Sequence, residues 1–203
     1  MRESEILALQ NIKGIGCAAI SKLIVYLGDL GASTLLDIDF DALVINPDLS
    51  RYKKVFETNL HKDSLKAAIN LANIEIESLE RKGIRVIAIT SDLYPQLLKL
   101  IKSPPTLLFC KGNIGLLSQN RNVALIGTRN NTQLGKLIAA KTTSFLVSSG
   151  FVIVSGLALG IDSIAHEKCL SSKGQTIAIL VDVENVQPSK NKRLAEDILS
   201  HGG

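Results

Sequence analysis

VALIGTRNNTQLGKLIAAKTTSFLVSSGFVIVSGLALGIDSIAH, residues 123–166, decides the fold of this 203-residue chain. Two apolar runs, 123–126 and 151–154, flank a segment whose large apolar residues recur at helical spacing: Leu134, Leu137, Ile138, Phe145 and Leu146. Fully apolar strands that flank a helix indicate a parallel β-α-β unit with both sheet faces covered. The sequence therefore predicts an α/β fold built on a parallel sheet.

The turns that follow these two strands are the first candidate binding residues, because ligands of open α/β sheets bind at the carboxyl ends of the strands. They contain Gly127, Thr128 and Arg129 after the first strand and Ser155 and Gly156 after the second. A guanidinium fork suits phosphate, although a structural salt bridge is the alternative for Arg129. The turns match neither GxGxxG nor a Walker A loop, so we expect no nucleotide cofactor.

A basic cluster opens the last predicted helix, at about 190–200. It contains Lys190, Lys192 and Arg193 and follows the third strand-end loop. The helix dipole disfavours positive charge at a helix N-terminus, so this arrangement favours an anion bound nearby. The alternative is an ordinary exposed helix face.

Asp162 and His166 are four residues apart and share a helix face. Asp162 is expected to cap the helix that it begins. An acid/base pair is the other interpretation, but the sequence offers no nucleophile and no third metal ligand beside it. We therefore predict neither a catalytic site nor a metal site.

Charge is distributed unevenly along the chain. Residues 1–78 contain 8 Lys/Arg and 11 Asp/Glu, a balance of −3, whereas residues 79–203 contain 15 Lys/Arg and 8 Asp/Glu, a balance of +7. A basic C-terminal part suggests a polyanionic partner, with a solvated basic surface as the alternative. Three widely spaced cysteines suit a reduced, cytoplasmic protein. No apolar run approaches the roughly 20 residues that span a membrane, so no membrane partner is expected.

The N-terminal part, residues 1–80, is predicted to be a helical domain. Gly14 and Gly16 lie between two helical patterns and resemble a helix-hairpin-helix element, whose turn exposes backbone N–H groups to phosphate. A tightly packed αα-hairpin is the alternative. Residues 81–203 form the second predicted domain, with strands at 84–89, 106–110, 123–126, 151–154 and 176–180 and helices at about 132–148, 162–171 and 190–200.

The C-terminal part resembles the bacterial DNA-processing protein A (DprA, or Smf) family. The matching segments run in consistent order: YPQLL (94–98), SPPTLLFCKGN (103–113), VALIGTR (123–129), VSGLALGIDSIAH (154–166) and GQTIAIL (174–180). Two positions depart from the family pattern. Leu159 stands where the family usually has a basic residue, and Gln187 stands where it has tyrosine. The resemblance further predicts that the chain lacks the family's C-terminal part, as a natural truncation or a fragment.

The resemblance implies a Rossmann-like fold, here C-terminally incomplete, behind a helix-hairpin-helix or SAM-like domain. It implies single-stranded DNA binding without catalysis, in DNA recombination and natural transformation (competence). The implied DNA contacts are Arg129 and either Lys192 or Arg193. The implied partners are the RecA recombinase and single-strand-binding protein, and a homodimer is left open. Two alternatives stay open: a Rossmann-like phosphoribohydrolase acting on nucleotides, and an inactive truncated remnant.

Overall fold

A computed structural model describes residues 1–203, except for the side chain of Val44. By packing, the chain forms two compact units, Met1–Cys110 and Lys111–Gly203. The first unit therefore contains the helical part together with the strands that follow it, and its buried core includes Ala88 and Leu107. The domain boundary near residue 80 stays a prediction.

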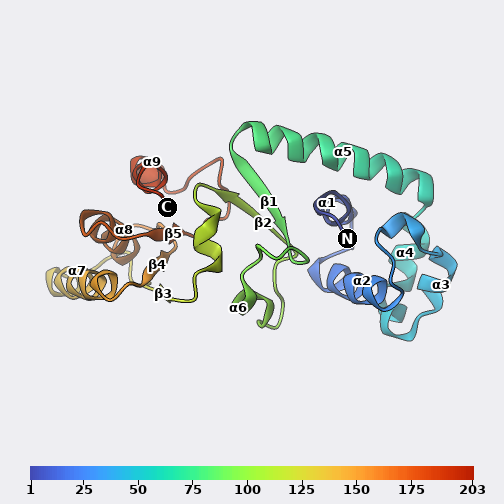
Figure 1. Cartoon of the computed structure of the whole chain (residues 1–203), viewed down its shortest axis with the longest axis horizontal. Coiled ribbons are helices and arrows are strands. Elements are labelled where there is room, and N and C mark those ends of the chain that lie inside the picture. The colour runs from blue at the N-terminus through green and yellow to red at the C-terminus, as the bar shows by residue number, and fades with distance from the viewer. The chain divides into compact units, whose positions relative to one another are not determined.

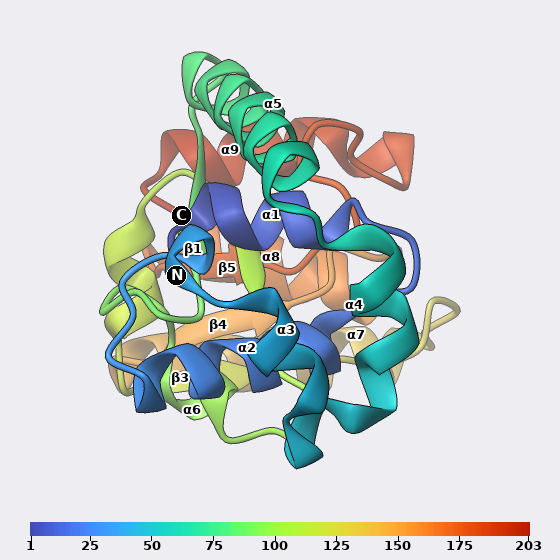
Figure 2. The ribbon, with the colours of Figure 1, turned by 90° about the vertical axis from the view of Figure 1, so that its right-hand side faces the viewer.

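Five helices and a two-stranded sheet dominate the first unit. The helices are α1 (Glu3–Gln10), α2 (Cys17–Asp29), α3 (Phe40–Ile45), α4 (Lys53–Asn59) and α5 (Lys62–Arg81), with 3-10 turns η1 (Leu35–Asp37) and η2 (Pro47–Tyr52). Strands β1 (Ile84–Ala88) and β2 (Leu107–Lys111) are neighbours, and the short α6 (Gln96–Lys99) lies between them in sequence. Helix α5 packs against α1 and crosses it, as Figures 1 and 2 show. The predicted pair of helices around Gly14 and Gly16 is confirmed as α1 and α2.

The second unit alternates strands and helices after the 3-10 turn η3 (Ile114–Ser118). Its elements are β3 (Asn122–Ala124), α7 (Gln133–Ser148), β4 (Val152–Ser155), α8 (Ile161–Ser171), β5 (Thr176–Ala178), η4 (Ser189–Asn191) and α9 (Lys192–Ser200). The strand order is β3-β4-β5, and both pairs are parallel. Helices α7 and α8 lie side by side (Figure 1). The predicted α/β class with parallel β-α-β units is confirmed.

Helix α7 differs from the sequence-based expectation in the face that it buries. Four of the large apolar residues that mark its periodicity are half or more exposed: Leu134, Leu137, Ile138 and Phe145. The buried positions are instead the small residues Ala139 and Thr143. Helix α7 packs against α8, and helical periodicity identified the helix without identifying its buried face. In the part of the chain that the structure describes, no helix is long and apolar enough to cross a membrane.

Candidate nucleic-acid interface

The turn after β3 presents its residues at the surface. Gly127, Thr128 and Arg129 are all exposed. Among the described residues, the Arg129 guanidinium has neither an ion-pair partner nor a hydrogen-bond acceptor, so the salt-bridge alternative finds no partner here. Gly127 permits the close approach of α8, because a Cβ at this position would lie 2.7 Å from Cβ of Ile161. The turn therefore packs on α8 through its backbone and leaves a free cationic side chain.

Ser155 and Gly156, after β4, have an inward role. Ser155 is buried, and its hydroxyl donates a hydrogen bond to the carbonyl of Leu125 at 2.5 Å. Its carbonyl accepts from the N–H of Ile179 at 2.8 Å. The N–H of Gly156 donates to Oδ2 of Asp162 at 3.2 Å. These groups connect the three strand ends to one another.

Asp162 lies in the first turn of α8, but it does not cap that helix. Its Oδ1 accepts from the N–H of Gly127 at 3.3 Å and its Oδ2 from the N–H of Gly156, so one carboxylate joins the turns after β3 and β4. The predicted cap is wrong because the N-cap residue is Gly160, and the N–H of Ile161 donates to the carbonyl of Thr128 at 3.2 Å. Gly160 has φ +89°, and a Cβ there would overlap that same carbonyl oxygen.

The basic cluster is anchored to the loop after β4 by a buried amide. Nδ2 of Asn191 donates to the carbonyl of Leu157 at 2.7 Å and to Oγ of Ser163 at 2.8 Å. The Ser163 hydroxyl in turn donates to the carbonyl of Ala158 at 2.6 Å. The neighbours of Asn191 in sequence, Lys190, Lys192 and Arg193, are all exposed. We call Arg129, Lys190, Lys192 and Arg193 together the basic edge.

The loop between β5 and the basic cluster carries an acidic turn. The carboxylate of Asp182 accepts from the N–H of Glu184 at 2.7 Å and from the side-chain amide of Asn185 at 2.8 Å. The hydrogen bond from the Asn185 side chain, with those from the backbone, lowers the pKa of Asp182. This loop therefore keeps a negative charge at neutral pH.

His166 is fully buried one helical turn after Asp162. The hydroxyl of Thr176 donates to the carbonyl of Ile153 at 2.8 Å, so its oxygen accepts the Nδ1 proton of His166, also at 2.8 Å. This assignment makes the ring the neutral Nδ1–H tautomer, and Nε2 has no hydrogen-bond partner among the described residues. Burial lowers the pKa of His166 to about 4, against opposing effects of the Asp162 carboxylate and the Ser155 backbone.

Asp162 and His166 do not form an exposed acid/base pair. Both are buried, and the carboxylate of Asp162 is engaged by two backbone amides. Within the described residues, no group of three His, Cys, Asp or Glu side chains is placed to hold a metal ion.

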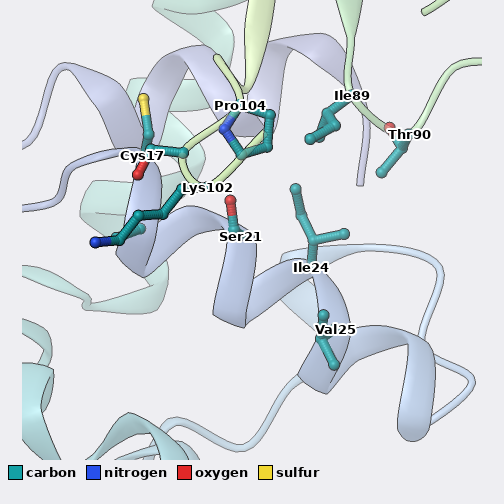
Figure 3. Close-up of a pocket in the computed structure, with 10 residues that line it drawn as sticks. Cys17, Ser21, Ile24, Val25, Ile89, Thr90, Lys102 and Pro104 are labelled. Atoms are coloured by element: carbon teal, nitrogen blue, oxygen red, sulfur yellow. The ribbon is translucent and has the colours of Figure 1, made fainter. Parts of the chain in front are cut away.

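The glycines of the predicted helix-hairpin-helix lie in the first unit. Gly14 has φ +93°, which a tight turn between α1 and α2 requires, and Gly16 is the N-cap of α2 with no side-chain cap. Beside the start of α2 is an open groove of about 440 Å³. Figure 3 shows Ile24, Val25 and Ile89 at one end, and Lys102 near Cys17 with its ammonium directed away from them.

This geometry defines a class of protein with a Rossmann-like fold, in which the strand ends of a parallel sheet carry a cationic surface. Residues 85–203 match the family described as DNA recombination-mediator protein A, and the chain belongs to that family. Over 166 residues it is 36% identical to the DNA processing protein DprA of Bacillus subtilis, covering 77% of this chain and 56% of the relative. Over 112 residues it is 40% identical to DprA of Streptococcus pneumoniae, covering 55% of this chain and 39% of the relative.

Two solved structures share the fold. The crystal structure of S. pneumoniae DprA matches 98% of this chain and 64% of its own, with a TM-score of 0.73 and 28% identity. A Helicobacter pylori DprA structure, described for its single-stranded DNA binding mode, matches 56% of this chain and 51% of its own, with a TM-score of 0.50 and 32% identity. The chain thus spans a third to just over half of the length of most of its curated relatives.

Proposed function

We propose that this protein binds single-stranded DNA through the basic edge and performs no catalysis. The observation that carries the proposal is the anchoring of the basic edge. Asn191 fixes the Lys190–Arg193 segment to the loop after β4, and Asp162 fixes that loop to the turn that carries Arg129. The segments that carry these cations are thus connected by hydrogen bonds, which supports joint contact with the phosphates of one strand.

The site residues have two kinds of role in this proposal. Arg129, Lys190, Lys192 and Arg193 contact phosphates. The hydroxyl of Thr128 donates to the carbonyl of Asn130 at 3.4 Å in the free protein, and in this proposal it turns from that long hydrogen bond to a phosphate. Gly127, Ser155 and Gly156 shape the surface through the backbone and do not supply side-chain contacts. The relative from H. pylori, whose structure was described for single-stranded DNA binding, supports this class of ligand.

The test is fluorescence anisotropy with a labelled oligothymidylate. Arg129→Ala combined with Arg193→Ala should weaken binding by roughly a hundredfold or more, because hydrogen bonds to charged groups contribute about 1.5–3 kcal/mol each. The slope of log K against log salt should fall by about 1.4, at roughly 0.7 per phosphate contact on a single strand.

The matched control also removes two positive charges. Lys141 is exposed in the middle of α7, and Lys173 follows the C-terminal end of α8, opposite the basic edge. Lys173 has φ +57°, which asparagine tolerates. The pair Lys141→Ala with Lys173→Asn should leave the affinity nearly unchanged. Equal losses in both double variants, or no loss in the first, would contradict the proposal.

By family membership we further propose a place in natural transformation and in recombination, with RecA and single-strand-binding protein as partners and with a cytoplasmic location. A pull-down of RecA by the purified chain, with and without a single strand, tests the RecA contact. Absence of any complex under conditions where an intact relative forms one would remove this partner.

A nucleotide-hydrolysing enzyme is the alternative that the fold leaves open. The buried engagement of Asp162 and His166 favours binding over hydrolysis. Release of free base from a nucleoside monophosphate, lost in Asp162→Ala, would overturn the non-catalytic proposal. A remnant that does not fold is the other alternative, and a cooperative thermal transition would exclude it.

We also propose that the turn at Gly14 and Gly16 gives a second, weaker contact with the DNA backbone. Gly16 and Cys17, at the start of α2, are exposed and no side chain caps this helix start, which supports such a contact. Lys13→Ala should then reduce affinity about fivefold or less in the anisotropy assay, because one exposed charge contributes about 1 kcal/mol or less. An unchanged affinity would confine binding to the second unit.

A further inference from the structure

Three consecutive residues at the start of α8 hold all three strand-end loops. The N–H of Ile161 donates to the carbonyl of Thr128 in the first loop. The carboxylate of Asp162 accepts from the first and second loops. The hydroxyl of Ser163 accepts from Asn191 in the third loop and donates to the second. We call Ile161, Asp162 and Ser163 the α8 hub.

We infer that Asp162 is a positioning residue for DNA binding. In this inference its carboxylate acts as a built-in anion, which occupies the strand-end amides of Gly127 and Gly156 and directs nucleic-acid phosphates to the side chains of the basic edge. The inference rests on the proposed function. It adds that Asp162 positions the loops of the basic edge and that the phosphates contact side chains there and not the strand-end amides.

The contacts of Asp162 support an internal anion. Asp162 is 7% exposed, and its two oxygens each accept from a backbone N–H of a different loop. Hydrogen bonds to an ionised acceptor are stronger than neutral ones. Gly156 has no room for a side chain, since a Cβ there would lie 2.9 Å from Oδ2 of Asp162. Backbone and carboxylate are thus packed directly against each other.

This arrangement has a chemical consequence for the ligand. Backbone amides after parallel strands commonly receive the phosphate of a nucleotide. Here the carboxylate already satisfies them, and its negative charge repels a second anion at the same place. Phosphates are therefore expected at the exposed guanidinium of Arg129 and at the cluster that Asn191 anchors. Such a surface suits a polymer with phosphates along its length better than a mononucleotide.

The decisive variant is Asp162→Asn, which keeps the shape of the side chain and removes one of its two acceptor oxygens. We expect it to weaken oligothymidylate binding roughly tenfold, the effect of about one hydrogen bond to a charged group. In an Arg129→Ala background the same change should weaken binding less than threefold, because Asp162 then has no positioned guanidinium to act through.

A structural control separates positioning from general destabilisation. Thr143 is buried in α7, and its hydroxyl donates to the carbonyl of Ala139 at 2.8 Å. Thr143→Val removes one buried hydrogen bond away from the strand ends and should leave DNA affinity unchanged. Equal weakening by Asp162→Asn with and without Arg129, or weakening by Thr143→Val to the same degree, would overturn the inference.

A measurement on the unmodified chain covers the case in which Asp162→Asn does not fold. In ¹⁵N-resolved spectra, addition of oligothymidylate should shift the Arg129 Nε signal and leave the Gly127 and Gly156 amides nearly unmoved. Strong downfield shifts of those two amides would show direct phosphate contact and overturn the inference. If Arg129→Ala and Asp162→Asn both leave affinity unchanged, the proposed function fails; if only Arg129→Ala weakens binding, the inference alone fails.

Discussion

Each of the two units of the chain is stabilised internally by a different kind of interaction. The first has a continuous apolar core drawn from its helices and strands, with residues such as Ile6, Leu23, Phe56 and Leu65 almost fully buried. The second has a small buried apolar cluster of Ile153, Ala165 and Cys169. Its strand ends are joined by the buried polar groups of the α8 hub and its partners. The candidate site therefore depends on hydrogen bonds more than on apolar burial.

A buried carboxylate in the first unit sharpens this contrast. Glu5 is 1% exposed, and it accepts from the N–H of Leu35 at 2.9 Å, from the N–H of Arg2 at 2.7 Å and from the hydroxyl of Thr34. It caps α1 and η1, two elements whose neighbouring side chains already pack in the core. Asp162 instead connects two strand-end loops that lie outside the buried apolar cluster of the second unit.

The largest effect is expected from opening the apolar core of the first unit. Phe56→Ala should lower the free energy of unfolding by about 3–5 kcal/mol, the range for truncating a buried phenylalanine. Urea titration followed by tyrosine fluorescence measures it cleanly, because all three tyrosines (Tyr26, Tyr52 and Tyr94) lie in this unit and the chain has no tryptophan. Phe145→Ala, at a side chain 69% exposed in the second unit, is the control and should change stability by less than about 1 kcal/mol.

The second unit should instead be sensitive to acid through His166. Its pKa is lowered in the folded state, from 6.5 to about 4, so the unfolded chain binds a proton more readily between those values. Stability from this group is complete above pH 6.5 and is lost as the pH falls to 4, by roughly 3 kcal/mol at about 1.4 kcal/mol per pKa unit.

Hydrogen exchange of residues 152–178 at pH 7 and pH 4.5 measures this loss. His166→Gln, which does not titrate, should show a smaller decrease in protection over the same range. Identical pH dependence in the two proteins would assign the acid sensitivity to other groups. The tyrosine signal of the first unit should change less than the exchange of this segment.

A smaller effect is expected at the amide that anchors the basic edge. Asn191→Ala should lower stability by about 1–3 kcal/mol, because the carbonyl of Leu157 loses its side-chain donor in a buried setting. DNA affinity should fall as well, although no charge has been removed. Asn185→Ala, in the exposed loop before the basic cluster, is the matched control. An affinity that stays constant in Asn191→Ala would mean that the cluster needs no anchor.

Local patterns in the sequence predicted the elements and left the long-range contacts undetermined. Apolar runs identified β3 and β4 within about two residues, because short buried strands need such runs. The same patterns assigned Asp162 to capping, since its position at a helix start favours that role. Its actual partners, Gly127 at a sequence separation of 35 and Gly156 at 6, are set by tertiary packing.

Asn191 was overlooked for a related reason. It stands within a basic cluster, and a run of Lys and Arg by itself indicates contact with phosphate and says nothing of a buried amide. The sequence offers one indication of this role, a polar and uncharged residue between two lysines. A residue that anchors such a segment is buried, and an uncharged side chain is buried at a lower cost than a charged one. Gly160 is a second residue whose role the sequence leaves open. Its φ of +89° and its close approach to Thr128 in the structure explain why the loop requires glycine there.

The smallest effect is expected from a change of carboxylate to amide at the surface of the first unit, the same chemical change as Asp162→Asn in the second. Glu57 and Lys53 form an ion pair at 3.8 Å one helical turn apart, with both side chains about half exposed. Glu57→Gln should lower stability by less than about 0.5 kcal/mol, because exposed pairs of this kind contribute little, and 1 M salt should abolish the difference. Asp162→Asn should lower the stability by more than Glu57→Gln does. High salt should leave that loss unchanged, because salt does not screen a buried acceptor. Thermal melts of the two variants in low and high salt would measure this, and equal losses would remove the distinction between the two units.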